Sequence, residues 1–403
     1  MTRICRGGSA LRARGSWTDM IEENNVYYRP DQDPEKDFVK QFQLDHLLSN
    51  RDTCRVYIVS PHIQGRSYWN PTSFEQFLKE GQVDPKIVAR NQKGECTVAL
   101  AVIREAWIEP RIIGLIDEFI QRNGIRKEYF YYITNSGRAH IDVNHYHMNI
   151  FMIRNYRQFY EHVSLPTSYV VGPKQRRFLC FNYALHAHRV WFYIMLHDQG
   201  VLENSYWSMP LQWREFGFMQ RIEYFKQAPI GRQVQETLAI SQEQIASAEH
   251  LLPLTADPDY SREYQDSNPH APQLYADSLV SIITETHFFE NTLHLTEKTF
   301  KPISFLHPFI MVSTAGSLAY LKGLGFKTFD SIWNESYDQE QDHVQRLIKL
   351  KELILTINNF SQDQLLELQH KIKPIVEHNY QHLLNVRSLH SQQFINDFLV
   401  LPQ

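Results

Sequence analysis

The chain has 403 residues, enough for two or three domains, so the size of the hydrophobic core is not limiting. Hydrophobic residues make up 43%, charged residues 21% and aromatic residues 13%, a composition that is typical of a globular protein and excludes a disordered chain. Lysine and arginine number 41 and aspartate and glutamate 45, a net charge of −4 that disfavours a dedicated nucleic-acid binder, which usually carries a basic excess.

Cysteine spacing and hydropathy limit the cellular setting. The four cysteines are Cys5, Cys54, Cys96 and Cys180. Their wide spacing excludes a zinc ribbon, a redox motif and a disulfide-dense scaffold, and favours a reducing cytoplasm. The most apolar run, residues 190–196, is far shorter than the roughly 18 residues that a membrane span needs. The Arg-rich segment up to Trp17 lacks the apolar region of a secretory signal, so we interpret it as a frayed leader, with an organelle transit peptide as the alternative.

Strand and helix patterns alternate along the first part of the chain. Runs of β-branched residues predict strands, and apolar residues that share one face predict helices. In chain order, the sequence predicts a strand over 54–60, a helix over 74–80, a strand over 97–103, a helix over 111–123 and strands over 129–134 and 149–154. Strands that alternate with helices at this spacing are typical of a parallel sheet with crossover helices.

The same alternation restarts after Gly172-Pro173. The sequence predicts strands over 177–182, 279–284 and 309–312, and helices over 188–199, 297–306, 317–322 and 347–357, with a last helix that begins at Ser361. The polar segment 256–273 is expected to be a long surface loop.

Two such alternations predict an α/β protein with two Rossmann-like domains that face a cleft. The expected parts are an N-terminal extension over 1–50, an acceptor-side domain over 51–173, a donor domain over 174–385 and a C-terminal helix or tail over 386–403. Ligands of such sheets bind outside the carboxyl ends of the strands, so functional residues are expected there.

Familiar catalytic and metal-binding motifs are missing or weak. The sequence has no phosphate-binding P-loop, zinc-protease motif, nucleophile elbow or dinucleotide fingerprint. Four short motifs could contribute to a metal site: two D-x-D triplets at 31–33 and 257–259, and two H-x-H pairs at 145–147 and 186–188. The triplets lie among prolines and the pairs lack a third ligand, so we predict neither a metal ion nor a cofactor.

The most informative segment begins with the strand that ends at Glu285. Thr296 is a good helix N-cap, so the free N–H groups of the next turn would lie together with Lys298 and Lys301. A positive helix end beside an ammonium group suits a diphosphate. Glu285 and Glu297 could accept hydrogen bonds from ribose hydroxyls, although Glu297 and Lys298 could equally form a surface ion pair.

A second signal lies earlier in the chain, where the strand over residues 178–183 is followed by Arg189 near the start of a helix. These two signals together resemble the donor half of GT-B-type glycosyltransferases, in particular the α1,3-fucosyltransferase-like group. That group has a strand end, a Thr-Glu-Lys helix start and an apolar strand containing proline, matched here by Glu285, residues 296–298 and residues 308–312. The group's phosphate-binding arginine is matched by Arg189.

The resemblance covers about residues 176–340, and the segments 325–329 and 335–338 are similar to phage and bacterial glycosyltransferase-like proteins. The acceptor half shows no match. The resemblance implies an inverting, metal-independent transfer of a sugar from a nucleotide diphosphate sugar to a glycan or other hydroxyl acceptor, in the cytoplasm of a bacterium or a virus-infected host cell. It does not imply that the sugar is fucose.

An inverting transfer also needs a general base and stabilisation of the leaving diphosphate. The resemblance assigns the second task to Arg189 and Lys298. The base is expected from the first domain, where Glu105 follows a predicted strand and His62 follows another. Both remain candidates.

Two alternatives stay open. The first is a non-catalytic module that binds a nucleotide or sugar phosphate, which would need no base. The second is a glycosyltransferase that acts on modified DNA bases, for which residues 174–177 could supply a local basic patch.

Overall fold

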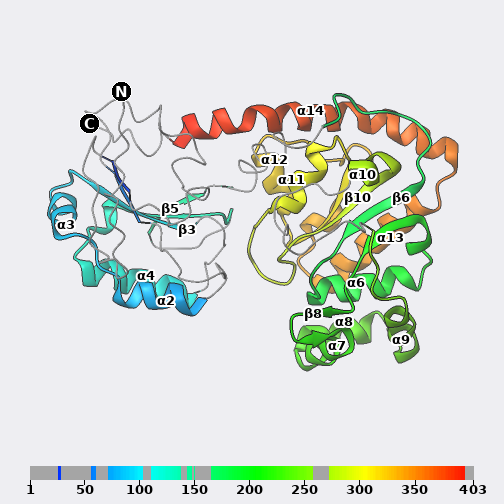
Figure 1. Ribbon diagram of the computed structural model, residues 1–403, viewed down its shortest axis with the longest axis horizontal. Coiled ribbons are helices and arrows are strands. Elements are labelled where there is room, and N and C mark those ends of the chain that lie inside the picture. The colour runs from blue at the N-terminus through cyan, green and yellow to red at the C-terminus, as the bar shows by residue number, and fades with distance from the viewer. Residues whose placement is uncertain are drawn as a thin grey trace. The chain divides into compact units, whose positions relative to one another are not determined.

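The computed structural model describes residues 26–28, 56–59, 71–102, 110–137, 143–147, 149, 165–256 and 272–394. The chain divides into two compact units: unit 1 comprises Met1–Arg154 with Asn385–Gln403, and unit 2 comprises Asn155–Leu384. This division lies upstream of the boundary expected at Gly172-Pro173. Each unit is built on its own parallel sheet (Figure 1), so the expectation of an α/β protein with parallel sheets is confirmed.

Unit 1 contains a sheet whose strands follow one another in chain order. Its elements are β1 (Val26–Tyr28), β2 (Val56–Val59), α2 (Pro71–Glu80), α3 (Pro85–Gln92), β3 (Thr97–Val102), α4 (Pro110–Asn123), a 3₁₀ turn (Lys127–Tyr129), β4 (Phe130–Thr134) and β5 (Asn144–His147). The strands pair in the order β1-β2-β3-β4-β5, all parallel. Each strand is added on the same side of the preceding strand, and the crossover connections are right-handed. The connecting helices α2, α3 and α4 therefore lie on one face of the sheet.

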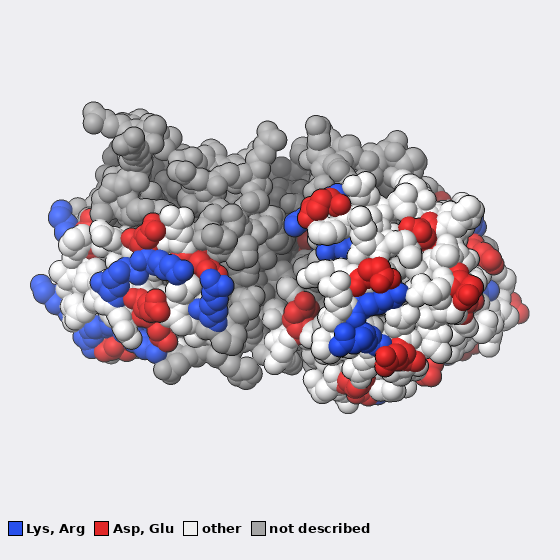
Figure 2. Space-filling view, turned by 90° about the horizontal axis from the view of Figure 1, so that it is seen from below, with Lys and Arg blue, Asp and Glu red and all other residues white. Residues whose placement is uncertain are grey.

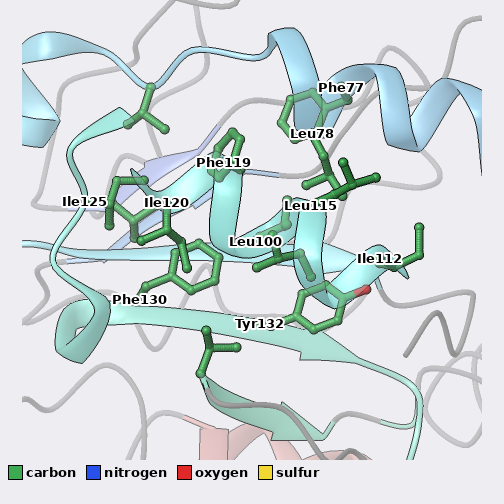
Figure 3. Packing of buried hydrophobic residues seen from close by; sticks show 14 of the residues in the cluster. Phe77, Leu78, Leu100, Ile112, Leu115, Phe119, Ile120, Ile125, Phe130 and Tyr132 are labelled. Carbon is green, nitrogen blue, oxygen red and sulfur yellow. The ribbon is translucent and has the colours of Figure 1, made fainter. Parts of the chain in front are cut away.

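The core of unit 1 lies between these helices and the sheet. In Figure 3, side chains of α2 and α4 point toward Leu100 of β3 and Phe130 of β4. The rings of Phe77 and Phe119 lie 5.6 Å apart between the two helices. The apolar residues of α4 recur at helical spacing. The helix ends at Asn123, and Gly124 follows it with a φ of 66°, a backbone conformation that favours glycine.

Unit 2 alternates strands and helices and carries an insertion of short helices. Its elements are β6 (Arg176–Phe181), α6 (Ala187–His197), a 3₁₀ turn (Leu202–Asn204), β7 (Ser205–Ser208), β8 (Gln212–Trp213), β9 (Phe216–Gly217), α7 (Phe218–Gln227), α8 (Pro229–Thr237), α9 (Gln242–His250), α10 (Pro272–Asp277), β10 (Ser278–Thr284), α11 (Glu297–Ser304), β11 (Phe309–Val312), α12 (Ser317–Gly323), a 3₁₀ turn (Ser336–Gln339), α13 (His343–Asn358) and α14 (Gln362–Phe394). In Figure 1 the labels α7, α8, α9 and β8 lie together at one end of this unit.

The main sheet of unit 2 differs from that of unit 1 because its order reverses. Its four parallel strands pair in the order β11-β10-β6-β7. The chain therefore first moves outward from β6 to β7 and then returns to the other side of β6 to form β10 and β11. Such a reversal is the switch point of a doubly wound sheet, and ligands bind outside the carboxyl ends of the strands there. In unit 2 that point lies between β6 and β10.

Helix α6 is buried on nearly all sides, with every residue from His188 to Leu196 in the core. It contacts α7, α9 and α13. The apolar run 190–196 is thus the centre of a globular unit. Among the described residues, no helix combines the length and the apolar character needed to cross a membrane.

The last helix, α14, begins with a reciprocal cap. The Ser361 N–H donates to Gln364 Oε1 at 2.8 Å, and the Gln364 N–H donates to Ser361 Oγ at 3.3 Å, as the sequence predicted. The helix runs without interruption from Gln362 to Phe394. The division between the two units falls within it, after Leu384.

Further along its length, α14 anchors the turn that follows α12. His382 Nε2 donates to the carbonyl of Leu324 at 2.7 Å, and His378 Nε2 donates to the carbonyl of Gly325 at 3.3 Å. Gly325 has a φ of 92°, and a Cβ at this position would lie 2.6 Å from the His382 ring. Both the backbone conformation and the close approach therefore require glycine.

Most predicted elements are present within a few residues of their expected bounds. The strand expected over 149–154 falls mostly outside the described residues, and β5 instead occupies 144–147. Most of the polar segment over 256–273 also lies outside the described residues.

The Gly325 turn yields a stability prediction. Gly325→Ala should lower the free energy of unfolding by about 1–3 kcal/mol, because it combines a left-handed backbone with a clash against His382. Gly323→Ala is the matched control, since nothing lies within 4 Å of its Cβ position and alanine favours the helix. Urea unfolding would measure both variants. Equal effects of the two substitutions would contradict this explanation.

Candidate functional site

The candidate site is the edge of the unit 2 sheet where β6 and β10 end, at the reversal of strand order. Helices α6 and α11 both begin at this edge, each after one of the two strands. The partial positive charge of a helix N-terminus makes such an edge attractive to anions. The residues predicted from the sequence, Glu285, Arg189 and residues 296–298, all lie here.

The Glu285 carboxylate holds the start of α11. Glu285 is fully buried, directly after β10. Its Oε1 accepts hydrogen bonds from the Thr296 N–H at 2.9 Å and the Thr299 hydroxyl at 2.6 Å, and its Oε2 accepts from the Thr296 hydroxyl at 2.7 Å and the Thr286 N–H at 3.3 Å. Four protein donors occupy the carboxylate. The geometry therefore gives Glu285 a positioning role, and its contact with a ribose stays a prediction that this arrangement does not favour.

The first turn of α6 is tied to the end of β10. Arg189 Nη2 donates to the carbonyls of Thr284 at 3.0 Å and Glu285 at 3.1 Å, and His188 Nε2 donates to the same Glu285 carbonyl at 2.9 Å. Burial lowers the pKa of Arg189 to about 10, although the Glu285 carboxylate opposes that shift. Arg189 Nε finds no hydrogen-bond partner among the described residues. Arg189 is thus a fixed cation at the predicted edge, with one nitrogen engaged by backbone carbonyls.

The first turn of α11 carries an ion pair that reaches solvent. Thr296 is the N-cap, as predicted, and its hydroxyl accepts a hydrogen bond from Lys298 Nζ at 3.1 Å. Lys298 Nζ also lies 2.8 Å from Glu297 Oε1, and the two side chains are 28% and 12% exposed. Lys298 is the partly exposed cation of the helix start. Lys301 lies one turn further along α11.

The charges around Glu297 keep it ionised. Burial would raise the pKa of the Glu297 carboxyl, but the charges of Lys298 and Lys301 and the hydrogen bond from Lys298 outweigh burial and lower that pKa to about 2. The ionised pair therefore persists at any physiological pH.

Cationic groups also surround His186, the N-cap residue of α6. Burial lowers its pKa well below the ordinary value, and the charges of Arg189, His188, Lys298 and His287 lower it further. A proton is thus disfavoured on His186 chiefly because the ring is buried, and the positive charges of Arg189 and Lys298 add to this effect. The same field favours an anion.

Several predicted groups fall elsewhere. Glu105 and His62, the candidate bases, lie outside the described residues, as do the D-x-D triplets. In the H-x-H pair at 186–188, the His188 ring is bound to the Glu285 carbonyl. Within the described ranges, no three His, Cys, Asp or Glu side chains are grouped so as to hold a metal ion.

The sequence analysis missed the brace that supports the loop between β10 and α11. Arg346 of α13 is buried and donates to the Phe288 carbonyl at 2.6 Å and the Glu340 carbonyl at 2.7 Å. Its guanidinium lies 4.2 Å from the Phe288 ring centroid, and the His188 ring is nearly parallel to that of Phe288 at a centroid distance of 5.5 Å. These contacts join residues far apart in the chain, so no local pattern indicates them.

The ion pair in α11 yields a pH prediction. Because the Glu297 pKa is lowered on folding from an ordinary 4.5 to about 2, its ionised form stabilises the fold above pH 4.5, and this stabilisation is lost as the pH falls toward 2. Glu297→Gln should therefore destabilise the protein at pH 7, on the order of 1–2 kcal/mol. The difference in the free energy of unfolding between Glu297→Gln and the unsubstituted protein should shrink below pH 4. Urea unfolding at several pH values measures it.

The control for this pH series is Glu352→Gln, which removes a carboxylate that is exposed on α13. Its effect on the free energy of unfolding should be small throughout. A difference for Glu297→Gln that stays constant from pH 7 to pH 2 would contradict the role of the ion pair.

The chemistry of the groups at this edge indicates the kind of ligand that the edge can bind. No protein-family model, curated protein or solved structure matches the chain. What this edge of unit 2 offers is two helix starts, a partly exposed ammonium group and a buried guanidinium. That combination is suited to an oxyanion such as a phosphate ester.

Proposed function

We propose that the protein is an inverting, metal-independent glycosyltransferase of the GT-B type, with two Rossmann-like domains, that uses a nucleotide diphosphate sugar as its donor. The observation that carries the proposal is the cationic edge at the order reversal of unit 2, where α6 and α11 begin and Lys298 reaches solvent. The resemblance of residues 176–340 to the donor half of such enzymes supports the same assignment.

The donor diphosphate would bind at the first turn of α11. The positive end of the α11 dipole and the Lys298 ammonium supply the positive charge, and the ammonium supplies hydrogen bonds, whereas the N–H groups of Thr296, Lys298 and Thr299 already have protein acceptors. Lys298 already contacts Glu297 and Thr296, so it is held in place for a ligand at the helix start. Arg189 adds a fixed positive charge from beneath the edge.

The transfer itself is a single displacement. The acceptor oxygen attacks the anomeric carbon, the bond from that carbon to the diphosphate oxygen breaks, and its electron pair leaves with the nucleoside diphosphate. The acceptor proton passes to a general base, for which Glu105 and His62 remain the predicted candidates. Lys298 and the start of α11 would stabilise the charge that develops on the leaving group.

A non-catalytic binding module would use the same donor-binding groups. The two functions differ in turnover, because only the enzyme releases a nucleoside diphosphate when donor and acceptor are both present. The alternative of a DNA-modifying enzyme gains no support from Figure 2, where the described Lys and Arg side chains of that face are mixed with Asp and Glu.

The donor site is tested by Lys298→Ala. The substitution should weaken binding of a nucleoside diphosphate by about one to two orders of magnitude, because a charge-assisted hydrogen bond contributes roughly 1.5–3 kcal/mol. Calorimetric titration with UDP, GDP, CDP and dTDP, with and without EDTA, would measure it. EDTA should change neither binding nor turnover.

The matched control is Lys322→Ala, which removes an exposed lysine of the same unit that is paired with Asp330 at 2.8 Å. The affinity of Lys322→Ala for a nucleoside diphosphate should equal that of the unsubstituted protein. Unchanged binding in Lys298→Ala, or turnover that EDTA abolishes and a divalent cation restores, would overturn the proposed donor site.

The base is tested separately. Glu105→Gln should leave donor affinity intact and lower the rate of transfer by about 10²-fold or more, the usual contribution of a positioned base. His62→Ala is the comparison. If His62→Ala has that effect and Glu105→Gln stays active, His62 is the base. A transferase unaffected by either substitution would refute both assignments.

A further inference from the structure

A second group of cations lies on the hairpin between β7 and α7. The strands β8 and β9 pair antiparallel, so that Trp213 is opposite Phe216. The Arg214 guanidinium lies 4.7 Å from the Trp213 ring centroid, and the Arg221 guanidinium of α7 lies 4.8 Å from it. Arg221 also lies 4.4 Å from the Phe216 ring. Two guanidinium groups are thus stacked on one indole.

Neither guanidinium is bound to a carboxylate of the described residues. Among the described residues, neither Arg214 nor Arg221 forms an ion pair, and the buried Nε of Arg221 has no hydrogen-bond partner. Burial lowers the pKa of Arg221, the charge of Glu215 opposes that shift, and the charge of Arg214 adds to it. Arg214 is exposed and Arg221 is half-buried, so the two like charges lie side by side on one aromatic ring at the surface of the unit.

The backbone of the hairpin also favours a role for Arg214. Its φ is 57°, a left-handed conformation that is unfavourable for a residue with a side chain. A glycine would adopt the same turn without strain. An arginine at this position therefore holds the backbone in an unfavourable conformation, and its side chain supplies the second guanidinium of the pair.

The hairpin adjoins the candidate site within unit 2. The Trp213 ring lies 5.2 Å from the ring of His186, the residue that begins α6 at the edge of the sheet. The His186 ring lies 6.0 Å from the ring of His188, which donates to the Glu285 carbonyl at the end of β10. The Arg214–Arg221 pair therefore adjoins the cationic edge through Trp213 and His186.

We propose that Arg214 and Arg221 form an oxyanion subsite that binds a phosphate or carboxylate group of a ligand. Guanidinium groups stacked on an aromatic ring keep their N–H edges available, and their planar fork matches a carboxylate or phosphate. Trp213 fixes both groups in place before the ligand arrives. This subsite goes beyond the donor diphosphate at Lys298 and binds its anion whether or not a sugar is transferred.

The test uses inorganic phosphate and malonate, with no nucleotide, in protein carrying Lys298→Ala so that the proposed donor site is already weakened. Calorimetric titration at constant ionic strength should show saturable binding of at least one anion. The anion that binds more tightly identifies the ligand group as phosphate or carboxylate. Adding Arg221→Gln should weaken this binding about tenfold or more.

Two further variants separate ligand binding from folding. Arg214→Gly removes the other guanidinium and relieves the left-handed backbone, so it should keep or raise the melting temperature while it weakens anion binding. Lys226→Gln removes a positive charge from the same helix, α7, where Lys226 is paired with Glu223 at 2.8 Å, and it should leave binding unchanged. If neither anion binds, or if both arginine variants bind as tightly as their parent, the inference is wrong. Because no nucleotide is used, failure of the donor site would leave this outcome unaffected.

Discussion

The buried Glu285 residue is the contact on which the rest of the site depends. Its carboxylate holds the first turn of α11, and its backbone carbonyl receives His188 and Arg189 from α6. One residue thus sets the distance between two helix starts on opposite sides of the strand-order reversal. Four donors satisfy the buried oxygens of the Glu285 carboxylate, so the start of α11 and the carboxylate stabilise one another.

Buried arginines serve the same purpose elsewhere in unit 2. Arg189 and Arg346 both point at backbone carbonyls, one at the end of β10 and the other at the loop that follows it. Carbonyl oxygens accept hydrogen bonds from these guanidinium groups without neutralising their charge. At the edge, the charge of Arg189 is opposed by the nearby carboxylates of Glu285 and Glu297.

The fold could be predicted from the sequence wherever a strand or helix carries its own apolar signal. Strand β10 is buried along its whole length, and the Thr296 cap is visible in the sequence and present in the structure. Residues 201–255 gave no prediction, because α7, α8 and α9 each bury only two residues and so offer few apolar positions from which to recognise a helix. At the site, the sequence could place Arg189 near this edge because Arg189 follows β6. The sequence could not indicate the carbonyls that Arg189 binds, since these belong to residues about a hundred positions later in the chain.

Helix α14 has a consequence for how the chain can be made and divided. Unit 1 is discontinuous, since Asn385–Gln403 belongs with Met1–Arg154. During synthesis, all of unit 2 emerges from the ribosome before Asn385–Gln403 does. Unit 1 is therefore completed after unit 2, although Met1–Arg154 emerges before unit 2. Cutting the chain after Leu384 would likewise remove part of unit 1 and leave every residue of unit 2 in place.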